Sequence, residues 1–295
     1  MSPKLEIIAP KLREWLRQSH FFEIIPSIYF NYLMSQIKYV VSFTTSPKRI
    51  KECHRMVKSL IRQYRKPDLI LLNIPKEFGR TGETYEIPPT LPSCVTINQI
   101  DRDYGPITKV WPTILYLRSK SYDMSKTRII YVDDDIYYPP RMVSTYAMLH
   151  RKYRRIPTIF SASGFNYENE NISHVSSHCH NVDVVEGFGS VSVLGSMFGD
   201  DFAPYLQKVL ENKDAYMSDD IIISNYFKKE NIPMKIVNQG SLFSLGNMVS
   251  KGCIMDYGNE SDALHLGADG MTTNNVNRYL KVIKFLREIE EFYLF

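Results

Sequence analysis

The stretch RIIYVDDDIYYPP, residues 128–140, carries the strongest sign of both fold and chemistry. Four apolar or aromatic residues, 129–132, lead straight into Asp133, Asp134 and Asp135, so the run predicts a buried strand with three carboxylates at its end. Neighbouring carboxylates repel one another and are costly to desolvate, and a bound cation offsets both effects. Such oxygen ligands suit Mg²⁺ or Mn²⁺, although a solvated acidic turn is the structural alternative.

Outward from this stretch, strands alternate with helices through the first half of the chain. Short apolar, β-branched runs predict strands at 39–45, 68–75 and 94–100, and helical patterns occupy 50–64 and 109–118. This alternation predicts an α/β fold with a mainly parallel sheet. Ligands of such sheets bind beyond the carboxyl ends of the strands, where the three aspartates are expected.

The second half of the chain is richer in strands, so the sheet is expected to become mixed. Strands are predicted at 158–165, at 182–195 with a Gly-rich turn inside it, and at 234–239, with a helix at 218–232. We expect a helical N-terminal extension over 1–37, a core domain over 38–275 and a closing amphipathic helix over 276–295.

Composition narrows the function classes. Of the 295 residues, 44% are hydrophobic and 23% charged, the balance of an ordinary soluble globular protein. The formal charge of +4 is too mild for a nucleic-acid partner. Early charged residues argue against a secretory signal, and no apolar run is long enough for a membrane span. We therefore expect a cytoplasmic, soluble protein with at most peripheral membrane contact.

Three blocks of sequence resemble one enzyme class. YVDDDIYYPP (131–140) resembles the DXD motif of nucleotide-sugar glycosyltransferases of the GT-A fold. DYGPITKVWP (103–112) is similar to the YGP-x-TK segment of a subset found in polysaccharide gene clusters and large DNA viruses, and VSFTTSPKRI (41–50) to their first strand and turn. The resemblance covers roughly residues 38–270. It implies a mixed, mostly parallel sheet flanked by helices, with helical extensions at both ends.

The resemblance also implies a place for the nucleotide. Thr44, Thr45 and Arg49 would lie near the base and ribose, with a simple strand-end turn as the alternative. Asp103 and Lys109 would help to hold the nucleotide. Lys109 suits a diphosphate because it is a point positive charge at the start of a helix, where the helix dipole also favours anions.

The metal site is implied by the same resemblance. Asp133 would contact the ribose, with Asp134 in the same nucleotide-sugar site. Asp135 would bind Mn²⁺ or Mg²⁺ bridging the two phosphates, and His265 would be a late metal ligand, with a structural histidine as the alternative. Such a metal acts as a Lewis acid for the departing nucleoside diphosphate.

The acceptor end is expected to supply the base. SDDII (218–222) resembles the acidic pair that opens a late helix of such folds, and in inverting members one carboxylate deprotonates the acceptor hydroxyl. Asp219 and Asp220 are the two candidates, with Asp220 preferred; acids that complement the helix dipole are the alternative. Glu186 and Phe188 are expected to contact acceptor sugars, and a bulged strand is the alternative there.

Other readings of the sequence remain open. HVSSHCH (174–180) has zinc-ligand residue types, but structural zinc sites spread their ligands over two separated pairs, which favours a polar loop. A metal-dependent nucleotidyltransferase or hydrolase could use the same aspartates, although SFTTSPKR lacks the glycines of the former. A non-catalytic glycan-binding module is a third alternative. The prediction is a hexosyl- or pentosyltransferase with a nucleotide-sugar donor, UDP-sugar favoured, and a glycan or glycoprotein acceptor.

Overall fold

The computed structural model describes residues 37–168, 171–175, 178–237 and 275–294. The chain divides into two units, Met1–Lys38 and Tyr39–Phe295, and only the second is described below. The N-terminal extension expected over 1–37 and the predicted metal ligand His265 lie outside the described residues, apart from residue 37 itself.

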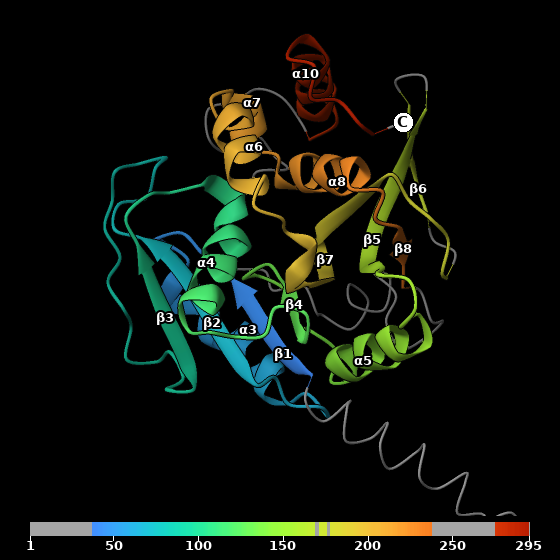
Figure 1. The fold of residues 1–295 in the computed structure, drawn as a ribbon. Coiled ribbons are helices and arrows are strands. Elements are labelled where there is room, and N and C mark those ends of the chain that lie inside the picture. The colour runs from blue at the N-terminus through green and yellow to red at the C-terminus, as the bar shows by residue number, and fades with distance from the viewer. Residues whose placement is uncertain (1–36, 169–170, 176–177, 238–274, 295) are drawn as a thin grey trace, which may run out of the picture. The chain divides into compact units, whose positions relative to one another are not determined.

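One mixed sheet forms the centre of the second unit (Figure 1). Its strand order is β3-β2-β1-β4-β7-β5-β6, and β8 pairs with β5. The eight strands are β1 (Lys38–Phe43), β2 (Leu69–Pro75), β3 (Val95–Ile100), β4 (Thr127–Tyr131), β5 (Ile159–Glu168), β6 (Asn171–His174), β7 (Val184–Leu194) and β8 (Met234–Ile236). β1, β2 and β3 are parallel, whereas β7 runs antiparallel to both β4 and β5. The architecture expected from the GT-A resemblance, a mixed and mostly parallel α/β sheet flanked by helices, is confirmed.

The central strands are buried on both faces, as parallel strands covered by helices are. In β1 every residue after Lys38 is buried, and in β2 every residue after Leu69 is. These continuous apolar runs do not alternate with polar residues. In the register of the two strands, Val40 pairs with Leu69. Val132 extends the same surface beyond β4, because its N–H donates to the carbonyl of Ser42 in β1 at 3.0 Å. The ends of β1 and β4 are thereby held together.

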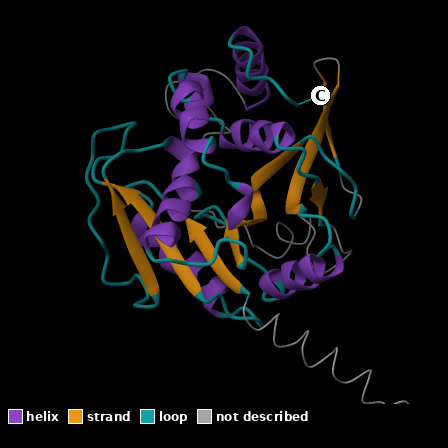
Figure 2. Cartoon of the chain, viewed as in Figure 1, coloured by secondary structure: helices purple, strands orange, loops and turns teal. Residues whose placement is uncertain are grey.

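Helices and short 3₁₀ turns connect these strands (Figure 2). They are η1 (Ile50–Glu52), α3 (Cys53–Ile61), η2 (Gly105–Lys109), α4 (Trp111–Ser119), α5 (Met142–Lys152), η3 (Gly195–Met197), α6 (Phe202–Val209), α7 (Lys213–Tyr216), α8 (Asp219–Lys229) and α10 (Asn275–Glu288). The expected helices at 50–64, 109–118, 218–232 and 276–295 correspond to α3, α4, α8 and α10. Most bounds differ by one to three residues, but α10 ends at Glu288, well before the expected end at 295. Within the described part of the chain, no helix combines the length and apolar character needed to cross a bilayer.

The turn expected inside residues 182–195 is wrong, because β7 continues through both of its glycines. Between Ser161 and Ser163 of β5, the paired residue on β7 changes from Val191 to Glu186, so the extra residues lie in β7 and form the bulged strand given above as the alternative. Glycine is required here for close approach. A Cβ on Gly189 would lie 2.8 Å from the Cβ of Ala162, and one on Gly187 would lie 2.5 Å from the amine of Lys109. The Gly-rich run therefore serves packing across the sheet rather than chain reversal.

The closing helix α10 belongs to the same compact unit as the sheet. Its buried residues include Tyr279, Val282, Ile283 and Leu286, which recur at helical spacing and form one apolar face. The ring of Tyr279 stacks on Phe165 of β5, with centroids 5.6 Å apart. The amphipathic character predicted for this segment thus reflects a face packed against the core.

Candidate functional site

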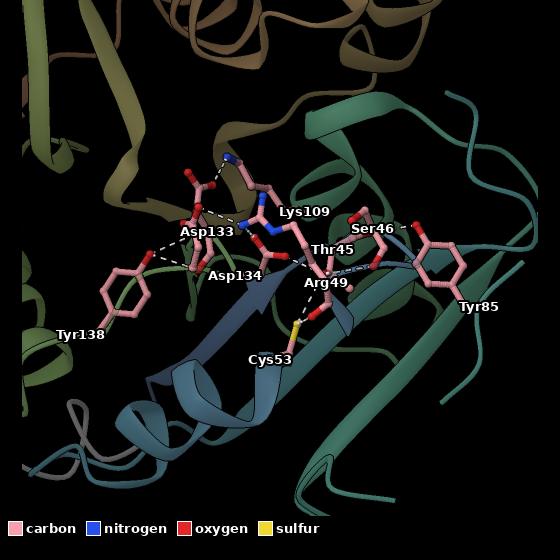
Figure 3. A network of polar contacts seen from close by, with 10 residues as sticks. Thr45, Ser46, Arg49, Cys53, Tyr85, Lys109, Asp133, Asp134 and Tyr138 are labelled. Atoms are coloured by element: carbon pink, nitrogen blue, oxygen red, sulfur yellow. Dashed lines mark hydrogen bonds and ion pairs between the residues drawn. The ribbon is translucent and has the colours of Figure 1, made fainter. Parts of the chain in front are cut away.

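An arginine-centred cluster joins the ends of β1 and β4 (Figure 3). Arg49, in the turn after β1, forms ion pairs with Asp134 and with Asp135, the latter at 2.8 Å. The hydroxyl of Thr45 donates to the other oxygen of Asp134. Because neighbouring strands end at the same edge of the sheet, residues far apart in sequence meet here. Thr45, Arg49, Asp134 and Asp135, all expected at the donor site, are brought together.

Burial makes the carboxylates of this cluster hard to ionise. Desolvation, reinforced by the charge of Asp134 and opposed by Arg49, raises the pKa of Asp135 to about 7. Desolvation likewise raises the pKa of Asp134, against the charge of Arg49. The Oδ1 atom of Asp135 is buried and has no hydrogen-bond partner within the described residues. An oxygen in that state is suited to an additional positive ligand.

Lys109 connects this cluster to a second acidic segment. Its side-chain amine lies 2.7 Å from Asp133 Oδ1 and 3.0 Å from Asp219 Oδ2, and the residue is only 5% exposed. Burial alone would lower the pKa of Lys109, but the charges of Asp133 and Asp219 raise it well above the ordinary lysine value. Its carbonyl accepts a hydrogen bond from Ser42 of β1. Lys109 is therefore a buried cation between two motifs.

Asp219 and Asp220 open helix α8 but point in different directions. Asp219 is 7% exposed and faces Lys109, whereas Asp220 keeps partial solvent exposure. Asp220 accepts hydrogen bonds from the backbone N–H of Gly187 at 2.8 Å and from the hydroxyl of Tyr279 at 2.9 Å. Desolvation and the neighbouring Asp219 raise the pKa of Asp220 well above the ordinary aspartate value, against the charge of Lys109.

The predicted acceptor residues lie on β7, beside this pair. Glu186 accepts a hydrogen bond from the hydroxyl of Ser163 at 2.6 Å and lies 3.5 Å from the Nε2 atom of His174. The hydrogen bond to Glu186 raises the pKa of His174. Glu186 and Phe188 are both partly exposed and alternate with the buried Gly187 along the strand. Their role in acceptor binding stays a prediction.

Asp103 is occupied within its own loop region. It accepts hydrogen bonds from the N–H groups of Gly79 at 2.7 Å and Gly105 at 2.8 Å, and from the hydroxyl of Thr108 at 3.2 Å. The positive φ of Gly105, +66°, lets the chain turn there into η2. In this arrangement Asp103 holds the loop ahead of Lys109. Its contact with a nucleotide stays a prediction, as does that of Thr44, which is partly exposed at the end of β1.

Several tyrosines at the site were not expected from the sequence. The hydroxyl of Tyr138 accepts from the N–H of Asp133 at 2.9 Å, and that of Tyr85 donates to the carbonyl of Thr45 at 2.8 Å. Tyr279 contributes from the closing helix. A usable signal was present there: a tyrosine on a buried helical face needs a partner for its hydroxyl.

The His- and Cys-bearing segment does not gather around one point. His174 faces Glu186 from β6, while Cys179 Sγ lies 3.0 Å from the Nε2 atom of His178. Across the described parts of the chain, no set of three or more His, Cys, Asp or Glu side chains is arranged to hold a metal ion. The metal site expected from the sequence includes His265, outside those parts, so it stays a prediction.

Comparisons with known proteins place few limits on this chain. No family model matches it, and no curated protein does. Among solved structures, residues 1–349 of S. aureus TarS are similar at 9% identity and a TM-score of 0.43, over 85% of this chain and 71% of that one. A 4-diphosphocytidyl-2C-methyl-D-erythritol synthase shows 11% identity and a TM-score of 0.38, over 71% and 93% of the two chains.

A further synthase of that kind, from Anaerococcus prevotii, shows 10% identity and a TM-score of 0.38, over 74% of this chain and 96% of that one. At these TM-scores the likeness supports no conclusion about what this chain does.

Proposed function

We propose that this chain is a metal-dependent glycosyltransferase that moves a sugar from a nucleotide sugar, with a UDP-sugar favoured, to a hydroxyl of an acceptor glycan. The observation that carries the proposal is the position of Lys109 between Asp133 and Asp219. It joins the acidic segment after β4 to the acidic pair that opens α8. Sugar transfer needs both a donor site and a base within reach of one reacting carbon, and this contact brings both segments to one place.

The site as a whole holds more carboxyl groups than cations. Five carboxylates surround two cations, namely Asp133, Asp134, Asp135, Asp219 and Asp220 around Arg49 and Lys109. A nucleoside diphosphate is itself an anion, so it is repelled unless a further cation lies between it and the carboxylates. The buried Oδ1 atom of Asp135, which has no hydrogen-bond partner among the described residues, fits a hard divalent cation in that position.

Asp135 would hold the ion, together with His265 according to the family resemblance. When bound, Mn²⁺ or Mg²⁺ would neutralise the two phosphates and supply Lewis acidity for the departing nucleoside diphosphate. Arg49 keeps Asp134 and Asp135 in place from the β1 side. Thr45 fixes the remaining oxygen of Asp134, which limits the directions open to the neighbouring Asp135.

Asp220 is the general base in this proposal. It retains solvent exposure, whereas Asp219 is buried against Lys109 and is engaged in holding that amine. An acceptor hydroxyl is a poor nucleophile, so a carboxylate must take its proton as the new bond forms. The raised pKa of Asp220 makes its ionised form a stronger base than an ordinary aspartate. A single base on the acceptor side corresponds to an inverting transfer, with Glu186 and Phe188 contacting the acceptor sugar.

A thermal-shift panel tests the proposal. UDP-, GDP- and CDP-sugars are each added to the protein with Mn²⁺ and with chelator, and CTP is included as the donor of a nucleotidyltransferase. We expect one nucleotide sugar to raise the melting temperature only when Mn²⁺ is present, because a bound ligand stabilises the folded state by mass action. Stabilisation by CTP alone, or by no nucleotide sugar, would overturn the proposal.

A further inference from the structure

Tyr279 places a hydroxyl from the closing helix against the acidic pair of α8. Its oxygen lies 2.9 Å from Asp220 Oδ2, and the residue is only 6% exposed. The ring stacks on Phe165 with an interplanar angle of 24°. Val282 and Ile283, the next residues on the same face, are also buried. The position of this hydroxyl is therefore set by the packing of the whole helix.

Tyr279 carries a hydroxyl on a helix face that is otherwise largely aliphatic. Val282, Ile283 and Leu286 fill the same face with aliphatic carbon alone. Phenylalanine would supply the same ring for packing. A buried hydroxyl costs free energy unless it has a hydrogen-bond partner. The hydroxyl finds its partner in Asp220. The polar atom is thus directed at Asp220, which is partly exposed, and not at the buried Asp219.

Two donors hold Asp220 from opposite elements. The N–H of Gly187 on β7 donates to Oδ1, and the Tyr279 hydroxyl on α10 donates to Oδ2. A carboxylate has about four acceptor positions on its two oxygens. Each oxygen therefore keeps one position for a substrate hydroxyl after its protein donor is bound. Together the two donors fix the plane of the carboxylate while leaving it able to accept a proton.

We propose that Tyr279 is a positioning residue for the catalytic base: its hydroxyl orients the Asp220 carboxylate and favours its ionised form, so that α10 is part of the active site. The inference rests on the function proposed above. It assigns to the last described helix a role that the sequence, in which that helix is a separate closing segment, does not suggest.

The groups that face Asp220 determine how its pKa should change when the Tyr279 hydroxyl is removed. Asp219 on α8 and Glu186 on β7 disfavour its ionised form, and Lys109 on η2 favours it. The ring of Tyr131 on β4 is close enough for Asp220 to raise the pKa of that phenol. A hydrogen bond donated to a carboxylate favours its charged form. Loss of the Tyr279 hydroxyl should therefore raise the pKa of Asp220 and move the acid limb of the rate profile to higher pH.

The test compares Tyr279→Phe with Tyr226→Phe. Tyr226 lies on α8 and, like Tyr279, donates to an aspartate, at 2.7 Å to Asp201 Oδ1, but Asp201 lies outside the site. The two variants thus remove the same kind of hydrogen bond. Each is unfolded by denaturant over a range of pH, which needs no ligand. UDP release from a panel of UDP-sugars with Mn²⁺ is followed over the same range.

In the unfolding experiment, wild type should have a higher free energy of unfolding than Tyr279→Phe. This difference should grow as the pH rises, because the contact is strongest when Asp220 is ionised. For Tyr226→Phe, the difference in unfolding free energy from wild type should already have its full size at acid pH. Hydrogen bonds from Lys229 and Tyr226 lower the pKa of Asp201, so this aspartate is ionised there. In the kinetic experiment, only Tyr279→Phe should move the acid limb upward, with kcat about tenfold lower on that limb and KM nearly unchanged.

A Tyr279→Phe profile that coincides with the wild-type profile would overturn the inference while leaving the proposed function intact. A gap in unfolding free energy that does not vary with pH would overturn it as well. If the wild type releases UDP from none of the sugars, the proposed function fails and the positioning of a base fails with it. The pH-dependent unfolding gap would in that case still record the contact itself.

Discussion

The amine of Lys109 lies 3.0 Å from Asp219 Oδ2, and both side chains are almost completely buried. The same amine lies 2.7 Å from Asp133 Oδ1. Since charges interact strongly where water is excluded, the ends of β4 and α8 form one electrostatic unit. The position of the donor end therefore depends on the position of the acceptor end.

Removing this cation should affect both stability and nucleotide binding. In Lys109→Ala, Asp219 loses its buried partner, and loss of one partner of a buried ion pair typically costs about 3–5 kcal/mol. Binding of UDP should also weaken, because a positive charge near the diphosphate is lost. Denaturant unfolding and titration calorimetry with UDP and Mn²⁺ measure the two effects. An unchanged dissociation constant for UDP, and for GDP if that is the nucleotide, would refute the nucleotide role of Lys109.

The glycine beside Lys109 should be as sensitive as the lysine. In Gly187→Ala the new Cβ would lie 2.5 Å from the Lys109 amine, which two carboxylates hold in place. We expect overpacking of about 1–3 kcal/mol and a large loss of transfer rate.

Gly199→Ala is the matched control for Gly187→Ala, because its Cβ would meet the side chain of Asp201 at 2.8 Å, away from the site. It should lose stability without loss of rate. Equal rates for the two variants would contradict this account of Gly187.

Stability should depend on pH through Asp135. Its pKa in the folded protein is raised to about 7, so its contribution to stability is complete below the ordinary aspartate pKa. That contribution is lost as the pH rises through about 7. In chelator, Asp135→Asn should therefore gain stability relative to wild type between about pH 5 and about pH 8.

Denaturant unfolding at the two pH values measures this difference, and Asp123→Asn, at an exposed site, is the control. The same Asp135→Asn variant should lose nearly all transfer while keeping its fold. A difference in unfolding free energy that is the same at both pH values would contradict the burial argument for Asp135.

The two aspartates of α8 should respond differently to amidation. In Asp220→Asn transfer should collapse by about a hundredfold to ten-thousandfold, the usual contribution of a general base, with UDP binding nearly unchanged. Asp219→Asn should act mainly through Lys109, and so on stability and donor affinity. Rates with saturating donor and a calorimetric titration with UDP separate the two. Near wild-type rates in both variants would place the base elsewhere, with Glu186 as the next candidate, and would put the inverting assignment in doubt.

Local sequence patterns predict the first half of the fold well. Apolar β-branched runs predict β1, β2 and β3, and helix α3 between the first two accounts for their parallel pairing. β2 and β3 are parallel as well, although no helix connects them. That geometry also explains why Arg49 and Asp134, from segments after different strands, could be expected together. Helices α5 and α6 were not predicted, and the glycines of β7 were taken for a turn because their function depends on neighbours in space.

The tertiary contacts of the site are the part that sequence could not supply. The expected role of Lys109 was a contact to the diphosphate, and the two carboxylates around its buried amine were not foreseen. Asp103 was expected at the nucleotide, and its oxygens are occupied by the backbone of Gly79 and Gly105. Tyr279 lies in a segment that seemed separate from the core. Each of these depends on packing between elements, which no single stretch of sequence encodes.

Release of nucleoside diphosphate from a panel of nucleotide sugars tests the central claim most directly. It is measured for wild type with Mn²⁺, for wild type with excess chelator, and for Asp135→Asn with Mn²⁺. The account predicts that at least one nucleotide sugar is cleaved by wild type with Mn²⁺, and that the chelator and the substitution each abolish the release. Release that persists in chelator and in Asp135→Asn, or no release from any donor, would contradict it.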